Sequence, residues 1–165
     1  MQKKVFQILV DNTSGTLSRI SGLFSRRGYN IESITAGVTA DPRFTRITIV
    51  TNGDDEILDQ IEKQVAKLAD VRDVKELKPD NSVYRELALI KVKVSPDERP
   101  GVITVAKALH ANIVDVSKDS LIIEITNAQE EIDRFIALLD CYEILELART
   151  GIAGLERGAE NIIYF

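Results

Sequence analysis

The same order of strand-like and helix-like segments occurs twice along the chain, and this repetition restricts the fold more than any other feature. A strand over residues 5–10 is followed by a helix, two strands, a second helix and a last strand. After "KPDNSVYRE", a stretch with the composition of a linker, the order begins again. A βαββαβ order folds into an antiparallel sheet with both helices on one face. The sequence therefore predicts an α+β protein of two ferredoxin-like βαββαβ domains in tandem, residues 1–77 and 85–165, joined by a linker at 78–84.

Individual residues repeat as well. The spacing D-x-x-x-G-x-L that begins at Asp11 matches D-x-x-x-G-x-I that begins at Asp97, and the pair Asn-Ile follows later in both copies. The second copy is four residues shorter before that pair, which is about one helical turn. Such a deletion keeps the helix face in phase, so we interpret the two halves as copies of one topology.

Periodicity and capping signals locate the helices within this order. Before the fourth helix, Asn127 stands three residues ahead of Glu130 and resembles a capping box, with Asn in the usual Ser or Thr role. The first helix has one apolar face. Its members are Leu17, Ile20, Leu23 and Phe24.

Composition excludes several classes of protein. The formal net charge of −5 argues against general affinity for nucleic acid, although Arg26-Arg27 forms a tight basic pair. No apolar run approaches the ~20 residues of a membrane span, and the first residues lack the apolar region of a signal peptide. The single cysteine, Cys141, can form neither an internal disulfide nor a multi-thiolate metal site. We expect a cytoplasmic protein.

The residues that catalysis needs are scarce. His110 is the only histidine and is expected at a helix end, while Cys141 lies beside apolar residues and is expected to pack. No glycine-rich phosphate loop or calcium loop occurs. Two other functions of this topology are disfavoured: an acylphosphatase-type hydrolase would need an Arg and an Asn on an anion loop, and an RNA-binding module would need aromatic residues on the sheet.

The loop "DNTSGTLSR" contains the best candidate site. Gly15 stands where the first strand turns into a helix, and the first turn of a helix has backbone N–H groups without partners. These donors can hold a carboxylate or phosphate, and Asn12, Ser14 and Thr16 add polar groups. The alternative interpretation is structural: Thr13 or Ser14 caps the helix, and Gly15 relieves backbone strain.

The stretch "ILVDNTSGTLSRISGLFSRRGYNIESITAG" resembles the N-terminal signature of the small, regulatory subunit of acetolactate synthase (acetohydroxyacid synthase). In that family an ACT domain begins with a strand, a D/E-N-x-x-G-x-L-x-R loop and a helix. The resemblance continues through "TRITIVTNGDDEILDQIEKQVAKL", "ELALIKVKV" and "RTGIAGLERG", so it covers nearly the whole chain. Thr13-Ser14 departs from the Pro or Ala of many members. The resemblance implies that residues 1–77 form an ACT domain for effector binding and dimerisation.

The resemblance also implies a function. The chain is expected to activate the catalytic large subunit and to confer feedback inhibition by valine, or another branched-chain amino acid, in branched-chain amino acid biosynthesis. An alternative is an ACT-type amino-acid-binding regulator of another enzyme. The chain is expected to form a homodimer, to have no catalytic residue, metal or cofactor, and to bind neither nucleic acid nor membrane. Thiamine diphosphate, Mg and FAD are expected on the catalytic subunit.

The residues of the effector site are carried over from the family. Branched-chain effectors differ by single methylene groups, each worth only ~1–3 kcal/mol in an apolar pocket, so the preferred one does not follow from the sequence. Arg26 and Arg27 either end the first helix in solvent, where the helix dipole favours cations, or contact the catalytic subunit. The implied effector-binding residues are Asn12, Ser14, Gly15, Thr16 and Leu17 of one protomer, with Asn30 and Ile31 of its neighbour.

Overall fold

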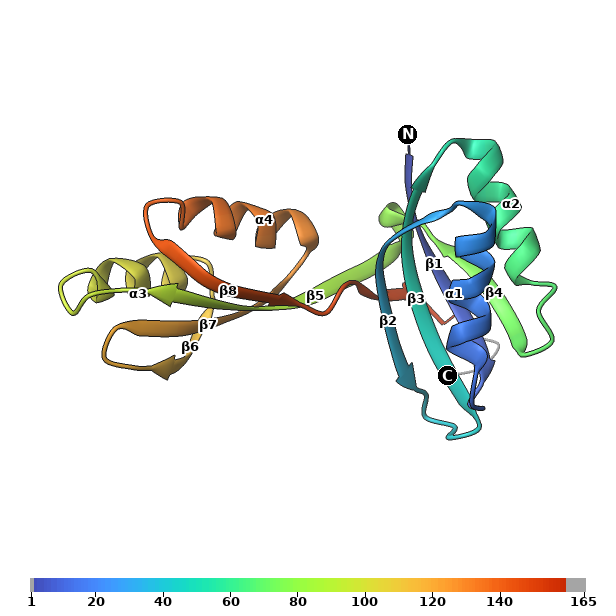
Figure 1. The fold of residues 1–165 in the computed structure, drawn as a ribbon, viewed down its shortest axis with the longest axis horizontal. Coiled ribbons are helices and arrows are strands. Elements are labelled where there is room, and N and C mark those ends of the chain that lie inside the picture. Colours follow the sequence, from blue (N-terminus) through green and yellow to red (C-terminus); the bar gives the residue numbers. More distant parts are fainter. Residues whose placement is uncertain (1, 160–165) are drawn as a thin grey trace. The chain divides into compact units, whose positions relative to one another are not determined.

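Residues 2–159 are described by a computed structural model, in which they form two compact units (Figure 1). Unit 1 contains residues 2–83 together with 151–159, and unit 2 is Tyr84–Thr150. The assignment of residues 85–165 to one domain stays a prediction. By its contacts, however, the segment 151–159 groups with the first unit, so the chain passes between the units twice.

Unit 1 has the predicted βαββαβ order. Its sheet has the strand order β2-β3-β1-β4, and the pairings of β1 with β3, β1 with β4 and β2 with β3 are antiparallel. Figure 1 shows α1 and α2 along the same face of this sheet. The elements are β1 (Gln2–Asp11), α1 (Thr16–Arg27), β2 (Asn30–Val38), β3 (Phe44–Gly53), α2 (Asp55–Val65) and β4 (Val71–Leu77).

Unit 2 repeats the topology with the strand order β6-β7-β5-β8. Two elements were not predicted: a 3-10 turn, η1 (Pro79–Asn81), and a short strand, β9 (Ala153–Glu156), which pairs with β5. Together, η1 and the start of β5 occupy the expected linker. The remaining elements are β5 (Ser82–Lys93), α3 (Arg99–Ala108), β6 (Asn112–Val116), β7 (Ser120–Asn127), α4 (Gln129–Leu138) and β8 (Glu143–Arg149).

The core of unit 1 lies between the sheet and the two helices. Phe6 and Ile8 of β1 meet Ile20 and Phe24 of α1, and all four are at most 1% exposed. Leu17 shares a helix face with Ile20 and Phe24 by its spacing, but it lies outside this core, and its side chain is 47% exposed. Its place at the start of the helix, beyond the edge of the core, leaves it in solvent.

Unit 2 has its own core, in which Ile90, Ile123 and Phe135 are buried. The predicted capping box is absent: Asn127 is the last residue of β7, and its Oδ1 accepts a hydrogen bond from the N–H of Ala128 at 2.8 Å. No side chain caps α4. Cys141 is exposed, so the expectation that it packs is also wrong.

The second face of the unit 1 sheet is covered in part. Val5, Leu9 and Val50 point away from the helices, yet each is at most 5% exposed. The segment 151–159 lies against this face: Gly151 adjoins Ser33 and Thr35 of β2, and Ile152 is 3% exposed. Lys75 of β4 forms an ion pair with Glu156 in this segment. Unit 1 therefore has three layers: helices, sheet and the C-terminal segment.

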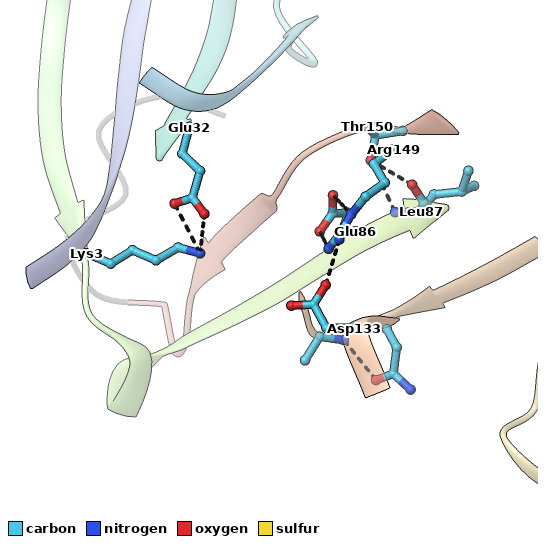
Figure 2. Close-up of polar contacts among 9 residues, drawn as sticks. Lys3, Glu32, Glu86, Leu87, Asp133, Arg149 and Thr150 are labelled. Atoms are coloured by element: carbon cyan, nitrogen blue, oxygen red, sulfur yellow. Dashed lines mark hydrogen bonds and ion pairs between the residues drawn. The ribbon is translucent and has the colours of Figure 1, made fainter. Parts of the chain in front are cut away.

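An ion-pair cluster holds the two ends of unit 2 together (Figure 2). Arg149 donates to both carboxylate oxygens of Glu86 at 3.0 Å and to Asp133 of α4 at 2.6 Å. The hydrogen bonds that Arg149 donates to Glu86 are the main cause that raises the pKa of Arg149. Next to it, the Leu87 N–H donates to the Thr150 hydroxyl at 3.1 Å. The cluster fixes β5 and β8 where the chain enters and leaves this unit.

Candidate functional site

The loop before α1 has an open helix end. Gly15 is the N-cap residue, with φ 85° and ψ −8°, a left-handed conformation that glycine adopts without strain. No side chain makes a capping hydrogen bond to this helix. The interpretation in which Thr13 or Ser14 caps the helix is therefore wrong. The amides of the first turn are left available to an external acceptor.

The threonine hydroxyls of the loop bond to one another. Thr16 is 4% exposed, and its Oγ1 lies 3.1 Å from the Thr13 hydroxyl and 3.1 Å from the Thr13 carbonyl oxygen. Its hydroxyl therefore faces into the loop. Thr16 shapes the loop from within, whereas Ser14 and Leu17 are exposed beside Gly15.

Asn12 attaches the loop to the connection between β2 and β3. Its Nδ2 donates to the Pro42 carbonyl oxygen at 2.9 Å, and its Oδ1 accepts from the Thr45 hydroxyl at 3.1 Å. Its backbone N–H donates to the Arg43 carbonyl oxygen at 2.8 Å. One amide hydrogen of the side chain is still free for a ligand, since an Asn amide has two donors. The contacts hold Asn12 in a fixed position.

The other two predicted residues lie at the far end of α1. Asn30 is exposed at the start of β2, and Ile31 is half-buried against the core. The twelve residues of α1 span ~18 Å between them and the loop. The structure therefore does not bring the two groups together within one chain. The strand that carries Asn30 is at the edge of the sheet.

Arg19 is a neighbour of the loop to which the sequence analysis gave no role. Its Nη1 lies 2.9 Å from where a β carbon on Gly15 would stand. Its Nε forms an ion pair with Asp70 at 2.5 Å. The sequence did contain a signal for this neighbour. Arg19 is the arginine of the D-N-x-x-G-x-L-x-R pattern, and its position four residues after Gly15 places it one helical turn away. Arg19 adds a positive charge where an anion would bind.

Arg26 and Arg27 occupy the last turn of α1 and are exposed. The guanidinium of Arg27 contacts the Gln64 side chain at 3.4 Å. This placement agrees with the preference for cations at the carboxyl end of a helix. Contact with a catalytic subunit stays a prediction for both residues.

Other kinds of site were sought in the same residues. Within 2–159, no group of three or more His, Cys, Asp or Glu side chains could hold a metal ion. No helix in this part of the chain is long and apolar enough to cross a membrane. A groove between α2 and β4, with Val71 and Val74 in its lining, contains none of the predicted site residues.

Known families match both halves of the chain. Residues 6–73 match the AHAS small subunit-like ACT domain, and residues 85–158 match the small subunit of acetolactate synthase. A protein of Methanothermobacter thermautotrophicus named "Probable acetolactate synthase small subunit" is 44% identical over 159 residues, which cover 96% of this chain and 95% of that protein. The chain belongs to the acetolactate synthase small-subunit family.

Further members of the acetolactate synthase small-subunit family agree. The Escherichia coli protein named acetolactate synthase isozyme 3 small subunit is 41% identical, with 94% of this chain and 96% of that protein covered. The crystal structure of the acetolactate synthase small subunit from Thermotoga maritima matches with a TM-score of 0.89 and 38% identity, covering 96% of this chain and 99% of that one. The family resemblance and the fold of two βαββαβ units with an N-terminal ACT domain are thus confirmed.

Proposed function

We propose that this chain is the subunit that activates the catalytic subunit of acetolactate synthase and makes it sensitive to inhibition by a branched-chain amino acid, with valine as the first candidate. Membership of the small-subunit family is the observation that carries the proposal. The reaction belongs to the partner, which would hold thiamine diphosphate, Mg and FAD. The complex would act in the cytoplasm, where this biosynthesis is expected.

The loop before α1 suits the carboxylate of an amino acid. The N–H groups of the first turn have no side-chain cap, and the helix dipole gives them partial positive charge. Gly15 keeps this approach open because it has no side chain. Exposed Leu17 would contact the aliphatic side chain of the effector, and Ser14 would add a hydroxyl.

The ammonium group of the effector needs acceptors, and the proposal takes them from a second protomer. Asn30 would contribute its amide oxygen, and Ile31 would add apolar surface. One chain cannot supply both halves, because α1 separates them by ~18 Å. In the described residues, β2 pairs on one side only, and its free edge can pair with the same strand of another copy. A homodimer joined along β2 would complete the site.

The test is acetolactate formation by the cognate catalytic subunit alone, with this chain, and with this chain plus valine. We expect the chain to stimulate the reaction and valine to reverse that stimulation. Gly15→Asp places a carboxylate where the effector's own would bind, so stimulation should persist but valine should no longer reverse it. Gly158→Asp is the matched control, because Gly158 also has a positive φ of 83° but open space around it.

Each outcome separates two parts of the proposal. A folded chain that fails to stimulate an active partner contradicts the regulatory role. Stimulation that valine reverses equally in Gly15→Asp contradicts the placement of the effector. Charge reversal at both Arg26 and Arg27 tests the proposed partner contact: it should weaken stimulation without affecting the fold, and unchanged stimulation rules that contact out.

A further inference from the structure

Arg46 lies on the face of the unit 1 sheet that is opposite the helices. Its neighbours in sequence along β3, Ile47 and Ile49, point into the helical core. Successive side chains of a strand point to opposite faces, so Arg46 points to the other face of the sheet. It pairs with Leu9 of β1 and with Gly37 of β2, which lie on that face too. The guanidinium is half-buried there.

This guanidinium has no hydrogen-bond or ion-pair partner among residues 2–159. Three other arginines of unit 1, namely Arg19, Arg43 and Arg72, each pair with a carboxylate. Burial lowers the pKa of Arg46, because a charged group loses hydration without gaining a counterion. A partly desolvated cation without a partner is costly to the free subunit.

None of the described acidic residues at this face, Asp11, Asp73 and Glu156, compensates the charge, and Glu156 is held by Lys75. Asp11 is held by Arg72, whose Nε donates to it at 2.7 Å. Asp73 pairs with Leu9 on the opposite side from Arg46, so the buried leucine stands between the two charges. Among the described residues there is room beside Arg46, since a β carbon on Gly37 would meet none of their atoms within 4 Å. A carboxylate from outside the chain can therefore reach the guanidinium.

We propose that Arg46 binds a carboxylate side chain of the catalytic subunit, so that this face of the ACT sheet is part of the interface with the enzyme. Guanidinium groups pair with carboxylates through two parallel hydrogen bonds, and partial burial strengthens that pair. The effector is assigned to the helical side, and a second copy to the β2 edge. The segment 151–159 contacts this face at Ser33, Thr35 and Lys75, and Arg46 has no hydrogen bond or ion pair with it among residues 2–159. The inference rests on the proposed function, because it requires a catalytic subunit as partner.

The experiment measures the affinity of the full chain for the purified catalytic subunit by isothermal titration calorimetry. Arg46→Gln should weaken binding at least about tenfold, because a partner carboxylate would be buried unpaired. Arg46→Lys keeps the charge but loses the two-bond geometry, so its affinity should fall in between. Arg43→Gln is the matched control: it removes an exposed arginine three positions away, and we expect affinity within about twofold of the unchanged chain.

Two further measurements exclude trivial causes. Arg46→Gln should unfold at the same temperature as the unchanged chain or higher, since it removes an unpaired, partly desolvated charge. It should also retain its affinity for valine. Binding of Arg46→Gln equal to that of the unchanged chain overturns the inference alone, whereas an unchanged chain that does not bind contradicts the proposed function as well. A loss of self-association by Arg46→Gln, seen by analytical ultracentrifugation, would assign Arg46 to an interface between copies and overturn the inference.

Discussion

Gly151 lies so close to Ser33 that a β carbon on the glycine would stand 3.0 Å from the Cβ of Ser33. Ser33 belongs to β2, the strand that begins with Asn30. The C-terminal segment therefore packs directly on the strand proposed to carry half of the effector site. One residue earlier, Thr150 is bonded to Leu87 in unit 2.

Gly151→Ala should destabilise unit 1 more than its small size suggests. The residue has φ +85°, and the new methyl group would stand 2.9 Å from the Thr35 hydroxyl oxygen. Backbone strain and overpacking together should cost about 2–4 kcal/mol in the free energy of unfolding, measured by urea denaturation. Gly28→Ala is the control, because Gly28 has φ +70° but nothing within 4 Å, and should cost about 1 kcal/mol. Equal losses would show that the contact with β2 has no energetic weight.

The strand and helix order could be predicted because each element shows its own period. The order of elements in unit 1 is the predicted one, and the expected strand over residues 5–10 lies within β1. Gly15 was placed at the start of a helix by its position between two such patterns. Local chemistry was sufficient there because the signals lie within a few residues of one another.

The segment after Thr150 could not be predicted, because its structure depends on distant partners. The four residues of β9 show no clear alternation, and the strand forms by pairing with β5. The apolar residues of β1 likewise lie on both faces of the sheet, as Ile8 and Leu9 show. The sequence pattern indicates that both faces are buried but not which segment packs on each. Asn127 does not cap α4 for a similar reason. It pairs with Glu86 in the β5–β7 ladder, so it belongs to the strand and not to the helix start.

Leu17→Ala should impair effector binding while leaving stability nearly unchanged. Its side chain is 47% exposed, so truncation removes little buried area, and the free energy of unfolding should change by less than about 0.5 kcal/mol. The affinity for valine, measured by calorimetry, should fall about tenfold as apolar contact is lost. Ile20→Ala, one turn along the same helix and fully buried, should instead cost about 2–5 kcal/mol of stability. An unchanged valine affinity in Leu17→Ala would remove that residue from the site.

Acid should weaken unit 1 partly through Asp11. The hydrogen bond from Arg72 is the main cause that lowers the pKa of Asp11 below its ordinary 3.8. The unfolded chain therefore binds a proton at this group before the folded one does, and the stabilisation is present above pH 3.8 and lost as the pH falls through the folded pKa. Arg72→Gln should flatten this part of the stability profile in urea titrations at successive pH values. Arg85→Gln, whose guanidinium bonds a backbone carbonyl, should leave the profile unchanged.

Arg149→Met should be the most damaging of the charge removals in unit 2. The Glu86 side chain is 2% exposed, so loss of Arg149 leaves a buried carboxylate without a counterion and should cost about 3–5 kcal/mol in the free energy of unfolding. The double variant Glu86→Leu with Arg149→Met should recover most of that loss, because no buried charge remains. Arg134→Met, which breaks an exposed pair with Glu131, should cost less than about 0.5 kcal/mol. If the double variant is no more stable than Arg149→Met, the ion pair contributes through geometry that apolar residues cannot replace, and the desolvation argument fails.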